Sequence, residues 1–547
     1  MGPCLQWLLL AICHVALLYG VLVTNSPTRS LSYWSSYLFE EIVPEPPKLL
    51  PRHPWPSLRG PDTSQFGASP VVVPSDLREA VLWLWQHPQG RYTTVIAGGP
   101  VIDVHGSIYL ATNDGIWKFG PKGHVNWHFP QEDRRMNTQP SLWNNTVFTS
   151  NENGFAYALD AFTAEIRWAH RLALESGPRC TYPAAHDGVF VVSSEIGHSK
   201  IMAGGDMHVY GLNATTGREL WRYTPYVHVW TFAPVFTGND TVIFMDFQGG
   251  MYCLGLHNGT EMWYRPVPDA NTSFSTGGAV IGHREDTFAC SNPGKSRGVE
   301  GERGFLRRIN ATDGTVLWSQ VLPQPCDSFP AVGHLGHVKR LAVVVTPGAA
   351  TGTKKRKSLH GSMMAFDVRH GDPIWRFSPD RYVGKKNMAY GDADALENRT
   401  KYNPLHKTCS PSHWSAVNID GDGVAFASRE DGILYGIYAD VDATPPIENG
   451  FELANLGPRF RSSGGLEVRK FRVRGASLHG SWAFGHGVVV VATCDLLFVF
   501  HDALEHPITN PFKIKPNVTN QSKSNLTAKA SRGFSWSLIR GWLKRLR

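Results

Sequence analysis

Hydrophobic residues along this chain come in short runs that are separated by clusters of Gly, Asn, Asp and Ser. The stretch Leu212–Trp221 (LNATTGRELW) predicts a strand, a tight turn and a second strand, because Asn213 can bond to nearby backbone and Gly217 can adopt a positive φ. The same pattern recurs at 159–168, 309–318 and 366–375, and shortened copies run over 119–127 and 256–263. Six related turns at a spacing of roughly 40 to 57 residues indicate a repeat architecture with the period of propeller blades.

The repeats divide the chain into eight units of four predicted strands each. The units begin near Pro100, Pro140, Pro183, Pro234, Gly278, Pro330, Ser415 and Ser481. The eighth unit ends without a Trp-bearing strand, and Ala80–Trp85 (AVLWLW) is a strand without a preceding partner that can supply it. Such closure removes open sheet edges. The fold class is therefore all-β, an eight-bladed propeller of four-stranded antiparallel blades over 76–504.

The turn LNATTGRELW and upstream strands such as GGMYCLGL resemble the repeats of the pyrroloquinoline-quinone (PQQ)-like eight-bladed propellers. That superfamily contains quinoprotein alcohol dehydrogenases and non-enzymatic outer-membrane assembly lipoproteins. The resemblance implies that the repeat tryptophans pack between blades and are structural. These residues are Trp127, Trp168, Trp221, Trp263, Trp318 and Trp375.

The resemblance does not extend to quinone chemistry. The dehydrogenases use a general-base Asp, a calcium ion held by Glu, Asn and Asp, and a disulfide between adjacent cysteines against the cofactor. This chain has no adjacent Cys pair, and no Trp floor for a cofactor can be matched residue by residue. We therefore expect a scaffold that is not an enzyme and carries no catalytic or cofactor-binding residues. The alternative is a diverged PQQ-dependent oxidoreductase, which needs a central tunnel around a planar cofactor.

Both ends of the chain differ from the repeats. Trp7–Thr24 is almost purely apolar, so 1–30 is either a signal peptide or a signal anchor. The Pro-rich region that follows predicts a semi-rigid linker over 31–75. The segment 505–547 is a polar tail that ends in Gly533–Arg547, where a basic amphipathic helix with possible membrane contact is predicted.

The N-terminal apolar segment and the glycosylation motifs point to the secretory pathway, where cysteines can form disulfides. Six Cys lie beyond the N-terminal apolar segment without CxxC spacing, which disfavours zinc. Cys326 and Cys409 are the better candidates for disulfides, whereas bridges and buried thiols are equally open for Cys253, Cys290 and Cys494. Ten N-x-Ser/Thr motifs predict glycosylation. They are Asn144, Asn213, Asn239, Asn258, Asn271, Asn310, Asn398, Asn517, Asn520 and Asn525.

One motif suggests a metal ion. Asn418, Asp420 and Asp422 place oxygen donors on alternate residues of a Gly-containing loop, a pattern that can bind Ca²⁺. The same residues also suit a plain Asp/Gly turn, and Phe426 stands where calcium loops of this kind carry a further acid. Calcium is thus the one cofactor that the sequence leaves open.

Charge and loop lengths narrow the partner. The net charge is +7, but the basic residues are spread out rather than gathered in a stripe, so nucleic acid is excluded as a partner. Long insertions interrupt blades three, five and six, and Arg376–Ser412 precedes blade seven. Because a rigid ring can carry variable loops, we expect a secreted or membrane-tethered scaffold that binds a protein or glycan through these loops.

Overall fold

The structure is a computed structural model that describes residues 52–503 apart from several internal segments. These segments are 61–65, 97, 134–135, 137, 177–180, 198–204, 268–274, 276–277, 283–285, 293–302, 338, 353–356, 385–413, 440–465, 474 and 476. The predicted signal or anchor and the predicted C-terminal helix lie outside the described residues. Among the residues described, no helix has the length and apolar character that a membrane crossing requires.

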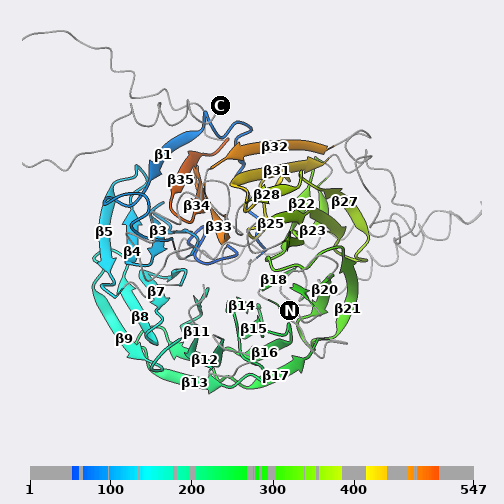
Figure 1. Ribbon diagram of the computed structural model, residues 1–547. Helices are drawn as coiled ribbons and strands as arrows, with labels where there is room; N and C mark the ends of the chain where they lie inside the picture. Colours follow the sequence, from blue (N-terminus) through cyan, green and yellow to red (C-terminus); the bar gives the residue numbers. More distant parts are fainter. Residues whose placement is uncertain are drawn as a thin grey trace, which may run out of the picture. The chain divides into compact units, whose positions relative to one another are not determined.

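Eight four-stranded antiparallel sheets follow one another round a ring, which confirms the predicted eight-bladed propeller (Figure 1). In each blade we name the strands a to d from the centre outward. Blades one to four consist of β2 (Val101–Ile102), β3 (Ile108–Thr112), β4 (Gly115–Phe119) and β5 (Val125–Pro130); β6 (Ser141–Trp143), β7 (Thr146–Ser150), β8 (Phe155–Asp160) and β9 (Ile166–Arg171); β10 (Ala184–His186), β11 (Val189–Ile196), β12 (Asp206–Asn213) and β13 (Glu219–Tyr223); β14 (Val235–Phe236), β15 (Thr241–Met245), β16 (Met251–Gly255) and β17 (Glu261–Arg265).

The second half of the ring repeats this order. Blades five to eight consist of β18 (Ala279–Ile281), β19 (Asp286–Ser291), β20 (Gly304–Asn310) and β21 (Val316–Leu322); β22 (Ala331–Leu335), β23 (Arg340–Val345), β26 (Met363–Asp367) and β27 (Pro373–Phe377); β29 (Asn418–Ile419), β30 (Ala425–Ser428), β31 (Ile433–Ala439) and β32 (Leu466–Arg472); β33 (Ser477–Gly485), β34 (Val488–Thr493), β35 (Leu497–His501) and β1 (Val81–Trp85).

The N-terminal strand closes the ring, as the sequence predicts. β1 pairs antiparallel with β35 and becomes the outermost strand of blade eight, with Trp85 opposite Leu497. The last blade is thus built from both ends of the repeat region. To open the ring, the pairing between β1 and β35 must therefore break, and so must any contacts between the blades on either side.

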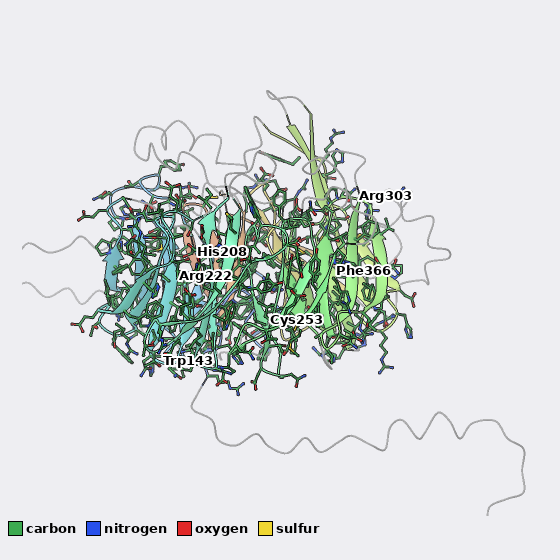
Figure 2. All side chains as sticks on the ribbon, turned by 90° about the horizontal axis from the view of Figure 1, so that it is seen from below. Trp143, His208, Arg222, Cys253, Arg303 and Phe366 are labelled. Carbon is green, nitrogen blue, oxygen red and sulfur yellow. A yellow bond between two sulfur atoms is a disulfide. The ribbon has the colours of Figure 1, made fainter. Side chains whose placement is uncertain are left out.

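An additional sheet belongs to blade six. The strands β24 (Gly348–Gly352) and β25 (Lys357–Gly361) interrupt the blade between β23 and β26, and β28 (Tyr382–Gly384) pairs with β25. In Figure 2 the pale green strands of this sheet project beyond the blades. The predicted insertion of blade six is therefore an ordered sheet in the described part of the chain.

The repeat tryptophans show how neighbouring blades are joined. The indole nitrogen of Trp168, on the outer strand of blade two, donates a 2.9 Å hydrogen bond to the carbonyl of Ala214 in the c–d turn of blade three. Gly217 of that turn has a φ of 72°, and a Cβ there would lie 2.6 Å from the Trp168 ring. The same bond joins Trp127 to Ala161, Trp221 to Leu256, Trp263 to Ala311 and Trp318 to Val368. The Asn/Asp–Gly turn of a blade therefore accepts a hydrogen bond from the preceding blade, and the Trp eight residues later donates one to the following blade.

Trp83 extends this pattern, and Trp375 departs from it. Trp83 of β1 donates to the carbonyl of Pro121 at 2.9 Å and lies over Gly123, so the closing strand makes the same bond to blade one. Sequence reasoning missed Trp83, because no turn precedes it. Trp375 of blade six is buried, but its indole nitrogen has no hydrogen-bond partner among the described residues. The Trp-to-turn bond is thus absent from the described part of the junction between blades six and seven.

The hydrophobic core lies between blades rather than inside one layer. The b strands are buried almost throughout, as β3 and β7 show, whereas the outer strands bury little beyond their Trp, as β13 and β17 show. One core cluster contains Phe148 and Trp168 of blade two with Phe190 of blade three. Each blade is therefore stabilised by its neighbours, as expected for a repeat protein.

The predicted linker over 31–75 is wrong from residue 52 onward. The N-terminal strap, which we define as residues 52–60 and 66–73, packs in the same compact unit as the propeller. Trp55 exchanges backbone hydrogen bonds with Ile102, and Pro56 accepts one from Leu142. A proline lacks the N–H group but keeps its carbonyl acceptor, so a Pro-rich segment can still pair along one edge. The apolar residues between the prolines, such as Trp55 and Leu58, are buried.

Candidate functional site

The antiparallel blades give the propeller two unlike faces. The a–b and c–d connections of every blade lie on one face, which we call the turn face, and the b–c and d–a connections lie on the other, which we call the loop face. The interruptions of blades three, five and six and the segment that precedes blade seven are all b–c or d–a connections. One further long connection joins the turn-face ends of β31 and β32, and its residues lie outside the described part of the chain.

The two most exposed large hydrophobic side chains among the described residues lie on the loop face. Leu174, in the d–a connection after blade two, is 78% exposed, and Tyr226, in the connection after blade three, is 68% exposed. The Tyr226 ring packs on Tyr252 and Tyr264, with centroids 6.2 Å and 4.7 Å away. An exposed tyrosine that is held by two other rings loses little conformational entropy when a partner packs on it, so it suits a contact residue.

The N-terminal strap fills the middle of the ring at the loop face. Leu58 belongs to one buried cluster with Tyr182, Ala233, Phe329 and Ala416. These four residues come just before the innermost strands of blades three, four, six and seven. The side chain of Leu58 therefore occupies the place where the blades converge.

Beside Leu58, Arg59 is also buried at the centre. Its Nη2 donates to the carbonyl oxygens of Pro330 and Val417, the latter at 2.8 Å. Its Nε and Nη1 have no partner among the described residues, and burial lowers the pKa of Arg59 to about 9. The Arg59 guanidinium occupies the place that a Cβ at residue 67 would take, so this position requires glycine. The strap and the blades thus share one packed centre.

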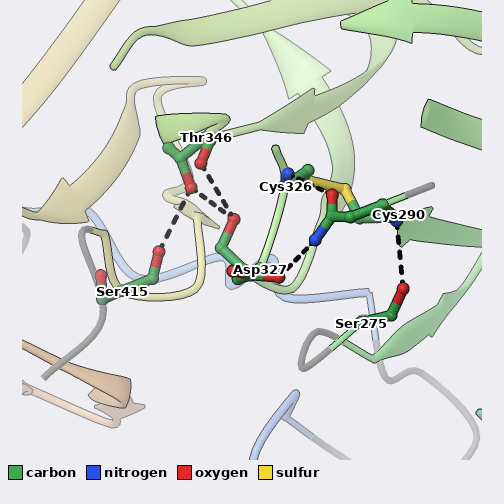
Figure 3. The surroundings of a disulfide bond; sticks show 8 residues. Ser275, Cys290, Cys326, Asp327, Thr346 and Ser415 are labelled. Atoms are coloured by element: carbon green, nitrogen blue, oxygen red, sulfur yellow. Dashed lines mark hydrogen bonds between the residues drawn. A yellow bond between two sulfur atoms is a disulfide. The ribbon is translucent and has the colours of Figure 1, made fainter. Parts of the chain in front are cut away.

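A disulfide fastens the loop face between blades five and six. Cys290, at the end of β19, is bonded to Cys326, in the d–a connection between the two blades (Figure 3). Cys494 is also disulfide-bonded, whereas Cys253 is a buried free thiol. The prediction of a bridge at Cys326 is confirmed, and Cys290 and Cys494 are resolved in favour of bridges.

Hydrogen bonds extend this fastening across three blades. Asn292 accepts from the Cys326 backbone at 2.7 Å and donates to Asp327, while its own N–H donates to Ser275 (Figure 3). The hydroxyl of Thr346 in blade six contacts Ser415, which precedes blade seven, at 3.4 Å. The connections of blades five to seven therefore form one cross-linked region.

Removing this disulfide should weaken the protein measurably. For a bridge that spans 36 residues, we expect Cys290→Ser/Cys326→Ser to lower the free energy of unfolding by about 2–4 kcal/mol. Urea unfolding followed by tryptophan fluorescence measures this change. Cys253→Ala is the control and should cost about 1 kcal/mol or less. Equal stability of the double variant and the control would show that the bridge contributes nothing.

A second loop-face group surrounds Asp114 of blade one. Its carboxylate accepts from His87 at 3.0 Å and from the hydroxyls of Thr94 and Thr112 at 2.6 and 2.7 Å. Burial opposes ionisation, but these hydrogen bonds outweigh it and hold the pKa of Asp114 well below its usual range. With all these donors engaged, the group holds a charged carboxylate in place rather than presenting a base to a substrate.

The three predicted calcium ligands lie in different surroundings. Asp420 is buried, and its two oxygens accept backbone N–H groups of Val73, Asp422 and Val424 at 2.8–3.1 Å. Asn418 is buried as well, whereas Asp422 is exposed. Asp420 thus secures the turn and the end of the N-terminal strap, and calcium at this loop stays a prediction.

The structure brings together three residues that sequence reasoning missed. The ligand atoms of Asp187, Asp240 and His257 lie within 4.8 Å of one another on the turn face, and all three side chains are exposed. The His257 ring contacts the Asp187 carboxylate at 3.2 Å. They come from separate turns of blades three and four, so no spacing in the sequence could have indicated them.

The described glycosylation motifs also lie on the turn face. Asn144 and Asn239 are in a–b turns, and Asn213, Asn258 and Asn310 are in c–d turns. The other five, Asn271, Asn398, Asn517, Asn520 and Asn525, lie outside the described residues.

Comparison with known proteins connects this geometry to one repeat type. A family model described as outer membrane protein assembly factor BamB matches residues 105–300. The chain is 24% identical to BamB of Moranella endobia over 246 residues, which are 44% of this chain and 58% of the relative. It is 21% identical to tetrathionate hydrolase of Acidithiobacillus ferrooxidans over 288 residues, 49% of this chain and 54% of the relative. The chain therefore spans somewhat more than half the length of these curated relatives.

Solved structures show the same fold at low identity. BamB from Moraxella catarrhalis matches with a TM-score of 0.50 and 14% identity over 77% of this chain and 99% of that one. Quinohemoprotein alcohol dehydrogenase from Comamonas testosteroni matches with a TM-score of 0.51 and 12% identity over 89% and 83%. The BamB-like repeat match over 105–300 and these solved structures therefore show that the chain has the eight-bladed propeller fold of PQQ-like proteins.

Proposed function

We propose that this protein is a glycosylated propeller scaffold of the secretory pathway that binds a protein partner through its loop face. The observation that carries the proposal is that the insertions of blades three, five and six start and end at the loop face, which also holds the exposed Leu174 and Tyr226 and the cross-linked connections of blades five to seven. A rigid ring with such a face is suited to binding. A glycan on the partner is a narrower version of the same proposal.

Two further features support the compartment and the kind of partner. Disulfides at Cys290, Cys326 and Cys494 suit an oxidising environment such as the endoplasmic reticulum or the cell exterior. The relatives named BamB are described as outer membrane protein assembly factors, and a description that concerns the assembly of proteins supports a protein partner here. Trp7–Thr24 and Gly533–Arg547 would tether the scaffold to a membrane.

The centre of the ring supports a scaffold over a diverged quinone-dependent oxidoreductase. A planar cofactor at the axis needs a tunnel, and Leu58 and Arg59 of the N-terminal strap fill this position. The residues at the axis therefore do not fit a quinone. Incubation with PQQ followed by a dye-reduction assay tests the alternative, and turnover would favour the enzyme.

Matched substitutions on the two faces test the binding proposal. We expect Leu174→Ala and Tyr226→Ala to weaken the complex that the protein forms in mild-detergent extracts of membranes by about fivefold or more. Phe162, which is 54% exposed in a c–d turn, is the turn-face counterpart, and Phe162→Ala should leave the complex intact. Native size measurement with mass spectrometry of the partners reports both. Loss of the complex with Phe162→Ala would contradict the loop-face assignment. An intact complex with all three variants would contradict it as well.

A further inference from the structure

The five described glycosylation motifs share one face of the propeller, although they come from four blades. Asn144 lies between β6 and β7, Asn239 between β14 and β15, and Asn258 between β16 and β17. Asn213 and Asn310 end the c strands β12 and β20. Since a–b and c–d connections lie on the same side of antiparallel blades, all five project from the turn face.

Turn chemistry alone does not explain why these positions carry asparagine. Asp160 of blade two holds its c–d turn by accepting the N–H groups of Phe162 and Thr163 at 2.8 and 3.0 Å. Asn213 of blade three does the same with Thr215 and Thr216 at 3.0 and 2.9 Å. Aspartate and asparagine are thus interchangeable for the turn, and only asparagine can carry a glycan.

The attachment atom is available at the c–d turns. In Asn213, Asn258 and Asn310 the side-chain oxygen accepts the N–H of the threonine that completes the motif, at 2.9–3.0 Å. The side-chain nitrogen of each, to which a glycan is joined, makes no hydrogen bond within the described part of the chain. Asn144, Asn239 and Asn258 are exposed.

We propose that N-glycans cover the turn face and restrict protein partners to the loop face. Glycans are bulky and hydrated, so a face that carries several cannot pack closely against another protein. The loop face holds none of the described motifs and carries the exposed Tyr226 and Leu174. The partner half of this proposal rests on the proposed function, whereas the glycan half stands alone.

Site occupancy tests the glycan half. Peptide N-glycosidase converts each glycosylated Asn to Asp, which peptide mass spectrometry detects. We expect conversion at Asn144, Asn213, Asn239, Asn258 and Asn310. Empty sites there, or conversion mainly at Asn271 and Asn398, which follow outer strands in the chain, would overturn the assignment. Asn213→Asp should remove one glycan without loss of stability, since Asp160 accepts the equivalent hydrogen bonds in the c–d turn of blade two.

Moving a glycan tests the partner half. His105→Asn creates the motif Asn-Gly-Ser in an exposed a–b turn, and Leu174→Asn creates Asn-Glu-Ser on the loop face, each by one substitution. We expect the loop-face glycan to reduce the native complex by at least about tenfold and the turn-face glycan to leave it within about twofold. His105→Gln and Leu174→Gln are the controls without a glycan.

A second loop-face glycan covers the side of blades six and seven. Pro379→Asn with Arg381→Thr creates Asn-Asp-Thr just after blade six, and Pro379→Asn alone carries no motif. If both loop-face glycans leave the complex intact, or if the glycan at residue 105 dissolves it, the sidedness of binding is wrong. If the unsubstituted protein forms no complex, the proposed function fails, and the occupancy data still decide where the glycans lie.

Discussion

Trp55→Ala should lower the free energy of unfolding of the whole propeller by about 3–5 kcal/mol. The Trp55 side chain is fully buried, and its ring packs on Phe484 of blade eight with centroids 5.1 Å apart. Its backbone pairs with Ile102 of blade one, so this residue lies where the first and last blades meet. The indole nitrogen has no partner among the described residues, so the loss is one of packing.

The measurement is urea unfolding followed by far-ultraviolet circular dichroism, with the m-value checked for a change in cooperativity. Arg52→Ala, an exposed position in the same N-terminal strap, is the control and should change stability by about 0.5 kcal/mol or less. If Trp55→Ala costs no more than the control, the strap does not belong to the cooperative unit. The residues from 52 onward would then behave as the linker that the sequence predicts.

Trp221→Phe should destabilise the protein by about 1–2 kcal/mol more than Trp375→Phe. Both tryptophans are buried on outer strands, and both substitutions replace an indole group with the smaller phenyl group. Trp221 donates to the carbonyl of Leu256 at 2.7 Å, which phenylalanine leaves without its partner. Trp375 has no described partner for its indole nitrogen, so its replacement removes packing alone.

The difference between the two variants isolates the bond between blades. Thermal or urea unfolding of both, under identical conditions, gives the comparison. Equal costs would show that the indole bond adds nothing beyond the packing of the ring. Gly259→Ala is a further check, because a Cβ at this positive-φ residue would lie 2.7 Å from the Trp221 ring. That substitution should weaken the same junction.

The repeat pattern predicted the blades because each blade is a local unit. A strand, a turn and the next strand are close in sequence, so the spacing of Asn213, Gly217 and Trp221 is enough to mark them. The same information located the starts of the units and indicated that the N-terminal strand completes the last blade. It could not indicate Trp83, because no repeat turn precedes this residue in the sequence. The carbonyl to which Trp83 donates lies in a turn of blade one.

The candidate binding face was only partly accessible to such reasoning. The insertions are visible in the sequence as interruptions of the period. That they share one face follows from the antiparallel order of the strands. Leu174 and Tyr226 carry no sequence signal, since exposure is set by which neighbours a folded connection meets. The Cys290–Cys326 pairing joins the end of β19 to the connection between blades five and six, and it depends on their positions in space.

The sequence by itself determined the repeat, the number of blades and the tryptophan on the outer strands of blades one to six, because these depend on residues a few positions apart. Only the tertiary structure decided what fills the centre of the ring. Leu58 and Arg59 come from a segment whose composition is typical of a linker, and their burial depends on contacts with residues 124 to 358 positions away. Contacts at that separation are specified jointly by all the blades that supply them, so no local pattern of residues records them.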